Sequence, residues 1–229
     1  MMARDSLKVL MGEVIQCQNC PELREYCARV AVEKRRAYRD QEYWGRPVPS
    51  FGAANAKLMI VGLAPGAHGA NRTGRMFTGD RSGDFLYRAL YETGFASKPA
   101  SVARGDGLEL IDAYITAAVR CAPPGNKPTR EEARKCRPYL AREIDLLKNV
   151  RVAVALGKFG FDAYLTVLRD RGLIRSCAAF QFGHNREHRI AAGSPVLISS
   201  YHPSQQNTST GKLTAKMLHD VFAHARRFI

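Results

Sequence analysis

The sequence predicts an α/β protein, a three-layer α/β/α sandwich around a central four-stranded, mainly parallel sheet. Two observations support this fold class. Four short apolar runs recur along the chain, and helical patterns separate them. Strands that alternate with helices form right-handed crossovers, which give a parallel sheet covered on both faces. Runs that are apolar throughout, without alternation, are typical of strands buried on both faces.

Each apolar run ends in a turn of polar or helix-starting residues. The predicted strands are residues 58–63, 113–119, 152–156 and 196–200. The predicted helices are residues 85–91, 129–147, 159–168 and 214–228. Thr129 and Glu132 have the spacing of a capping box, which marks a helix start. We expect a hairpin or loop over the polar residues 175–193.

The length fits one domain, and the charge points to a polyanionic partner. We predict a single domain over residues 1–229, in which residues 1–55 form an N-terminal segment that wraps the core. The 35 Lys and Arg residues exceed the 21 Asp and Glu residues, giving a formal net charge of +14. Such a field attracts polyanions, nucleic acid above all. The charge is spread along the chain, so we expect a folded basic surface.

The chain lacks the sequence signals of export and of membrane insertion. Its N-terminus has no apolar signal core, and no run approaches the roughly 18 apolar residues of a membrane span. We therefore expect a cytoplasmic protein with no membrane partner. In a reducing compartment the six cysteines are expected as metal ligands, catalytic groups or buried thiols rather than as disulfides.

The cysteine spacing predicts a metal site. Cys17 and Cys20 form a Cys-x2-Cys pair, which can present two thiolates from one turn, and Cys121 and Cys136 form a second, wider pair. Four thiolates can hold zinc or a four-iron cluster, and the spacing does not choose between them. Cys27 is a rival for the fourth position, and small buried apolar thiols are the structural alternative. A site with four protein ligands would clasp the N-terminal segment to the loop after the second strand.

The stretch after the first predicted strand is a candidate functional site. Residues 62–80 read GLAPGAHGANRTGRMFTGD, longer than the roughly two to six residues that usually join a strand to a helix. Ligands of open α/β sheets bind beyond the carboxyl ends of the strands. We expect this loop to meet Asn126, Lys158 and His202, which follow the other three strands, in one cleft.

The motifs after these strands resemble those of the uracil-DNA glycosylase superfamily, specifically its iron-sulfur family five, also called type b. The resemblance rests on the cysteine pattern and on GLAPGAHG (62–69), NRTGRMFTGD (71–80), RCAPPGNKPT (120–129) and HPS (202–204). It implies extrusion of uracil, and of other deaminated bases such as hypoxanthine, from double-stranded DNA. Hydrolysis of the N-glycosidic bond would leave an abasic site. A monomer associated with the nucleoid is expected.

The resemblance also implies roles for individual residues. A [4Fe-4S] cluster would be held by Cys17, Cys20, Cys121 and Cys136, with zinc as the alternative. The implied catalytic residues are Asp80, His202 and Asn126. The implied substrate-binding residues are Gly62, Ala64, Gly66, Phe77, Asn126 and His202. The implied DNA-binding residues are Arg72, Arg75, Ser204, Gln205, Gln206 and Asn207.

The implied chemistry divides between the base and the sugar. His202 would donate a hydrogen bond to the base oxygen that gains negative charge, and Phe77 would stack on the base. Better-known relatives carry an acid where this chain has Leu63 and Ala64, so Asp80 would orient water or stabilise the cationic sugar.

Four of these residues have an ordinary structural role as the alternative. Phe77 could be a core residue, and Asn126 could form a turn. His202 could serve packing, and Asp80 could cap the following helix.

Two other classes of function fit the sequence less well. A nucleotide- or phosphate-binding enzyme would use the glycine loop, but GLAPGAHG is neither a Walker loop nor a dinucleotide fingerprint. A non-catalytic nucleic-acid-binding module containing zinc or a cluster would have no need of Asp80, Asn126 and His202 at strand ends.

Overall fold

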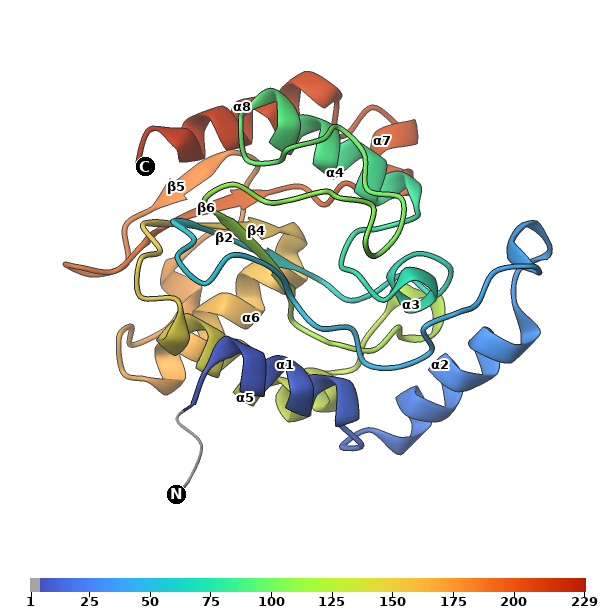
Figure 1. Ribbon diagram of the computed structural model, residues 1–229. Helices are drawn as coiled ribbons and strands as arrows, with labels where there is room; N and C mark the ends of the chain where they lie inside the picture. The colour runs from blue at the N-terminus through green and yellow to red at the C-terminus, as the bar shows by residue number, and fades with distance from the viewer. Residues whose placement is uncertain (1–4) are drawn as a thin grey trace.

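A six-stranded mixed sheet forms the centre of the protein, in a computed structural model that describes residues 5–229 (Figure 1). Its strand order is β1-β3-β2-β4-β6-β5. The strands are β1 (Phe51–Gly52), β2 (Leu58–Gly62), β3 (Ala113–Ala117), β4 (Val152–Leu156), β5 (Arg186–His188) and β6 (Val196–Ser200). The four inner strands are parallel and are the four that the apolar runs predict.

The predicted count of four strands is wrong, because an antiparallel strand is added at each edge of the sheet. β1 has two residues, too few to give a pattern, and β5 is Arg-Glu-His, a polar sequence suited to an edge. Residues 175–193, expected as a hairpin or loop, are mostly loop with a 3₁₀ turn (Cys177–Ala179), and they contribute β5, which pairs antiparallel with β6.

Helices cover both faces of the sheet, as the sandwich requires. They are α1 (Leu7–Gln16), α2 (Pro21–Glu33), α3 (Ala70–Thr73), α4 (Arg81–Glu92), α5 (Arg130–Leu146), α6 (Gly157–Asp170), α7 (Gln205–Ser209) and α8 (Ala215–Arg226). Figure 1 shows α4 and α8 together on one face, with α1, α5 and α6 on the other. Leu86 of α4 and Phe222 of α8 belong to the core of the first face, and Leu140 and Phe161 to that of the second.

The predicted helix start at Thr129 is confirmed. Its hydroxyl accepts a hydrogen bond from the Glu132 amide, and the Glu132 carboxylate accepts one from the Thr129 amide. The two bonds satisfy amides that a helix start leaves free. They fix the point where the loop after β3 becomes α5.

The N-terminal segment contributes two helices, α1 and α2. α1 packs on α5, and Arg142 of α5 forms ion pairs with Asp5 and Glu13. α2 lies beside α3, where the Asn71 side chain donates a hydrogen bond to the Cys27 carbonyl at 3.3 Å. Across residues 5–229, every helix is too short or too polar to span a bilayer.

Candidate active site

Two aromatic rings from different strand ends lie against each other at the carboxyl edge of the sheet. The ring centroids of Phe77, in the loop after β2, and His202, after β6, are 5.8 Å apart. A Cβ atom on Gly62 would lie 2.8 Å from the Phe77 ring, and one on Gly157 would lie 3.1 Å from the Cβ of His202. The two glycines therefore leave the space that the two rings occupy.

Phe77 and Asn126 both have left-handed backbone conformations, with φ of +52° and +56°. Only three other non-glycine residues among residues 5–229 have positive φ: Lys34, Asp112 and Asn185. Such conformations are strained for residues with a Cβ and gather at functional sites. A Cβ on Gly83 would lie 1.8 Å from the Phe77 carbonyl oxygen, so α4 packs directly against the strained backbone.

The two carboxylate oxygens of Asp80 have different surroundings. Oδ1 accepts a hydrogen bond from the Gly83 amide at 3.0 Å, which makes Asp80 the N-cap of α4 and confirms the capping role. Oδ2 lies over the glycine loop, where a Cβ on Gly66 or Gly69 would be 2.9 or 1.9 Å away. Burial raises the pKa of Asp80, although the hydrogen bond from Gly83 opposes this. Capping therefore engages one oxygen and leaves the other facing the loop.

His202 is half-buried and held through its backbone. Burial lowers its pKa to about 4, so the ring is neutral at pH 7. The Asn207 side chain donates a hydrogen bond to the His202 carbonyl at 2.9 Å. The preceding Tyr201 stacks on His184, with centroids 5.0 Å apart, and its amide donates to His184 Nδ1 at 3.3 Å. Contacts on both sides therefore hold the backbone at His202 in place, and the ring lies against Phe77.

Arg72 and Arg75, which the resemblance implies as DNA-binding residues, are only 8% and 5% exposed. Arg72 donates hydrogen bonds to the carbonyls of His68 and Gly79 at 2.8 and 2.6 Å. Arg75 forms an ion pair with Asp106 at 2.5 Å. These guanidinium groups hold the glycine loop in shape, and their contact with DNA stays a prediction.

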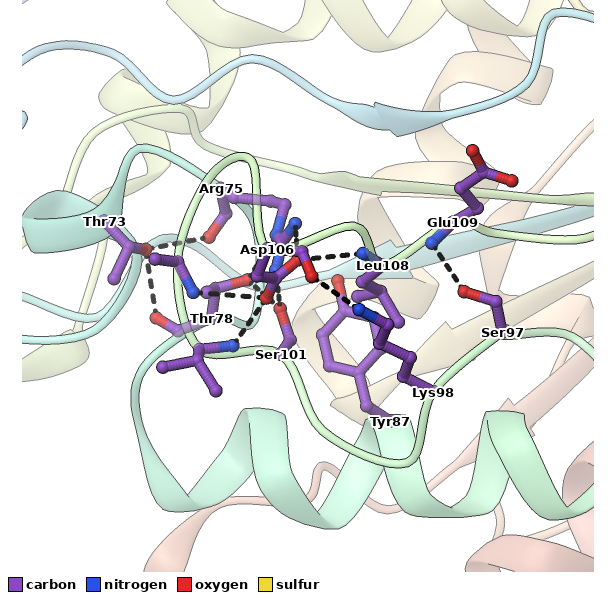
Figure 2. Close-up of polar contacts among 12 residues, drawn as sticks. Thr73, Arg75, Thr78, Tyr87, Ser97, Lys98, Ser101, Asp106, Leu108 and Glu109 are labelled. Carbon is purple, nitrogen blue, oxygen red and sulfur yellow. Dashed lines mark hydrogen bonds and ion pairs between the residues drawn. The ribbon is translucent and has the colours of Figure 1, made fainter.

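Asp106 is the centre of the network that fixes Arg75 (Figure 2). Its carboxylate also accepts hydrogen bonds from the amides of Val102, Ala103 and Leu108. Burial alone would raise the pKa of Asp106, but the hydrogen bonds from Arg75 and the amides hold it well below its usual range. A second loop is thereby tied to the glycine loop.

The other predicted DNA-binding residues lie at α7. Ser204 caps this helix by accepting a hydrogen bond from the Asn207 amide at 3.3 Å, and the Asn207 side chain is engaged with His202. Asn207 therefore supports His202 in this structure, and its contact with DNA stays a prediction. Gln205 and Gln206 are exposed, and their contact with DNA stays a prediction.

The residues expected in one cleft have different surroundings. Gly62, Phe77 and His202 lie together, and Asn126 is exposed in a 3₁₀ turn (Pro124–Asn126). Lys158 is exposed and forms an ion pair with Asp162 at 2.6 Å. Ala64 packs against the apolar cluster that surrounds Cys121 and Cys136.

Four of the six cysteines line one small cavity, which we call the cysteine cavity: Cys17, Cys20, Cys121 and Cys136. They come from the end of α1, the start of α2, the loop after β3, and α5. Cys27 is absent from the lining, and its thiol donates to the Ala122 carbonyl at 3.6 Å. All six cysteines are free thiols. Within residues 5–229, no three His, Cys, Asp or Glu side chains are arranged to ligate a single metal ion.

A buried ion pair beneath this cavity has no counterpart in the sequence predictions. Arg120 and Glu143 are each 1% exposed and are joined by a contact of 2.5 Å between Nη2 and Oε2. Thr116 and Tyr114 of β3 also donate hydrogen bonds to Glu143. The sequence feature that could have revealed this pair is a spacing: Glu143 follows Cys136 by seven residues, so both lie on the same face of α5. The pair connects the loop after β3 to the helix that carries a cysteine.

Comparisons with known proteins agree with this arrangement. Residues 49–226 match the model of the uracil DNA glycosylase superfamily. A type-5 uracil-DNA glycosylase of Mycobacterium leprae is 49% identical over 97% of this chain and 95% of its own length. Type-5 enzymes of Thermus thermophilus and Pyrobaculum aerophilum are 49% and 46% identical, over 92% and 94% of this chain and 93% and 90% of their own. The chain belongs to the uracil-DNA glycosylase superfamily and, within it, to the type-5 uracil-DNA glycosylases.

Proposed function

We propose that the protein is a DNA glycosylase that hydrolyses the N-glycosidic bond of uracil extruded from double-stranded DNA. The observation that carries this proposal is the contact between Phe77 and a neutral His202, together with an Asp80 oxygen that faces the glycine loop. The relatives that match nearly the whole chain are named for this activity.

The base is held by an aromatic face and a hydrogen-bond donor. Extruding a base from the stack costs a few kcal/mol, less where the lesion pairs weakly, and stacking on an aromatic ring recovers part of that cost. Phe77 provides the ring. His202 is neutral at pH 7, so its N–H group can donate to the base oxygen that gains charge as the bond breaks. A donor fixed in this way stabilises the transition state without reorganisation.

The sugar becomes positively charged as the base leaves, and Asp80 is the carboxylate that acts on the sugar. Its Oδ2 is free of the capping bond and lies over Gly66 and Gly69. A carboxylate there orients the attacking water or stabilises the cationic sugar. The positions Leu63 and Ala64 offer no carboxylate, so the reaction depends on Asp80 and on leaving-group stabilisation by His202.

We extend the proposal to other deaminated bases, hypoxanthine among them. Stacking on Phe77 tolerates different bases because every base has a π-face. Asn126 would supply an amide to the base edge, and Gln205 and Gln206 would contact the duplex. A monomer acting on chromosomal DNA in the nucleoid fits this activity.

We propose a [4Fe-4S] cluster as the cofactor, with zinc as the alternative. The support for a metal group at this place is the four thiols of Cys17, Cys20, Cys121 and Cys136, which line one cavity. When bound, the cluster would clasp the segment containing Cys17 and Cys20 to the core. It stands outside the hydrolysis itself.

The alternative function is a non-catalytic nucleic-acid-binding module. An excision assay separates the two: duplexes containing uracil or hypoxanthine are incubated with the protein, and abasic sites are then cleaved with alkali. We expect strand breaks at the lesion. Intact strands for every lesion, with binding to the same duplexes retained, would support the module instead. The absorption spectrum tests the cofactor, since a cluster absorbs near about 400 nm and a zinc protein is colourless.

A further inference from the structure

Two arginines at the cysteine cavity each have one buried nitrogen without a partner. Arg24 and Arg120 both line the cavity. Within residues 5–229, only three buried side-chain polar atoms lack a hydrogen-bond partner, and two of them are the Nε atoms of these arginines. Buried donors without partners are rare in proteins, so two at one cavity indicate a missing acceptor.

The remaining nitrogens of both guanidinium groups are already engaged. Nη1 and Nη2 of Arg24 donate to the Gly45 carbonyl at 3.3 and 3.2 Å. In Arg120, Nη1 donates to the Ser50 hydroxyl and Nη2 to Glu143. These bonds fix each guanidinium plane and leave its Nε–H group as the free donor.

The lining of the cavity favours an anionic group. Its cationic residues are Arg24, Arg120 and Lys135, and the lining contains no Asp or Glu. α2 begins at this cavity, with Cys20 as an N-cap that makes no side-chain capping bond, so the positive end of the helix adds to the field. The Arg120 amide also donates to Cys136 Sγ at 3.3 Å. An iron-sulfur cluster held by four thiolates carries net negative charge and has sulfur acceptors.

We propose that Arg24 and Arg120 donate their Nε–H groups to sulfur atoms of the bound cluster, and that Arg24 also compensates part of its negative charge, since the charge of Arg120 is already paired with Glu143. This inference rests on the cofactor proposed above. Hydrogen bonds to the sulfurs and nearby positive charge favour the more negative, reduced state and raise the reduction potential. Both arginines are therefore positioning residues of the cofactor, which retain it and set its potential.

The test uses the intact protein and Arg24, which is half-buried and can be replaced without breaking an internal ion pair. The matched control is Arg29→Gln, because Arg29 is on the same helix and its side chain is 55% exposed. We expect Arg24→Gln to lose its absorbance to an iron chelator roughly tenfold faster than the control, the scale of one charge-assisted hydrogen bond. Its midpoint potential should fall below that of the control, with Arg24→Lys in between.

Arg120 needs a paired replacement, because removing it alone would leave Glu143 charged and buried. The variant Arg120→Gln with Glu143→Gln, shown to be folded by circular dichroism, should also have faster cluster loss and a lower potential. Rates and potentials equal to those of Arg29→Gln in both variants would overturn this inference while leaving the cluster in place. A wild-type protein without iron and sulfide would overturn the cofactor proposal and this inference together.

Discussion

The Asp80 carboxylate occupies the space that a side chain on residue 69 would need. A Cβ atom on Gly69 would lie 1.9 Å from Asp80 Oδ2 and 2.7 Å from its Cγ. Because Gly69 has no side chain, the Asp80 carboxylate can lie directly against the loop. Gly62 leaves room for the Phe77 ring in the same way. A substitution at Gly69 therefore tests whether the position of the Asp80 carboxylate matters for the site.

Gly69→Ala is expected to displace the Asp80 carboxylate and to lower single-turnover excision about a hundredfold, the cost of misplacing a catalytic group. The matched control is Gly12→Ala on α1, where nothing lies within 4 Å of the added Cβ. The control should keep full activity and gain up to about 1 kcal/mol of stability. Unchanged excision in Gly69→Ala would argue against a catalytic Asp80.

Asp80→Asn is expected to lower excision about a hundredfold or more while keeping or raising the melting temperature. Burial raises the pKa of Asp80, so its charge opposes folding above the unfolded-state pKa, and the Asp80 contribution improves as pH falls. Asn removes that charge and remains a good N-cap. Thermal unfolding at pH 7 and at pH 4 checks the sign, since the gain over wild type should shrink at the lower pH.

Phe77→Leu is expected to lower excision roughly ten- to a hundredfold through loss of base stacking, which is worth about 1–3 kcal/mol. The control is Phe85→Leu on α4, also partly buried but outside the ring pair. Titration with a duplex carrying an abasic site separates stacking from backbone binding. Both variants should bind that duplex alike, and equal excision by the two would remove Phe77 from the base site.

The depressed pKa of His202 predicts a stability loss in acid. The unfolded state takes up a proton below about pH 6.5, whereas the folded state resists until about pH 4. The His202 contribution is thus complete above about pH 6.5, and on the order of 1–2 kcal/mol is lost by pH 5. Urea unfolding from pH 8 to pH 5 checks this, with His202→Gln giving a flatter curve than the wild type. Parallel curves for wild type and His202→Gln would contradict the assignment.

Arg75 is expected to behave as a structural residue. Arg75→Ala leaves the partly buried Asp106 without its partner and should cost about 3–5 kcal/mol of unfolding free energy. The milder Arg75→Lys should remain folded and bind DNA with the wild-type salt dependence. A salt slope lower by about one would instead indicate a lost phosphate contact.

The sequence patterns predicted the inner sheet well, because fully buried parallel strands are apolar at every position. Two strands, β4 and β6, were predicted to the residue. The start of α4 was placed four residues late, at Phe85 instead of Arg81. Gly83 weakens the helical pattern there, and the structure shows why it is needed: its Cα packs on the Phe77 carbonyl.

The sequence does not show in which direction a side chain points, and this limited the predictions at the site. Phe77, Asp80 and His202 were identified from motifs, and their surroundings suit the proposed chemistry. Arg72 and Arg75 stand in the same motif, but composition cannot show that they point inward to loop carbonyls and Asp106. The Arg120–Glu143 pair joins residues 23 positions apart, a contact that only the packing of α5 on the sheet creates.

The most direct test of the account measures release of free uracil from a duplex with one uracil–guanine pair, in single turnover, beside equilibrium binding to the same duplex. Wild type should release the base. His202→Ala should release it about a hundred- to a thousandfold more slowly while binding the duplex with near wild-type affinity. Release at the wild-type rate by His202→Ala, or equal losses of release and binding, would contradict a site that acts on the extruded base.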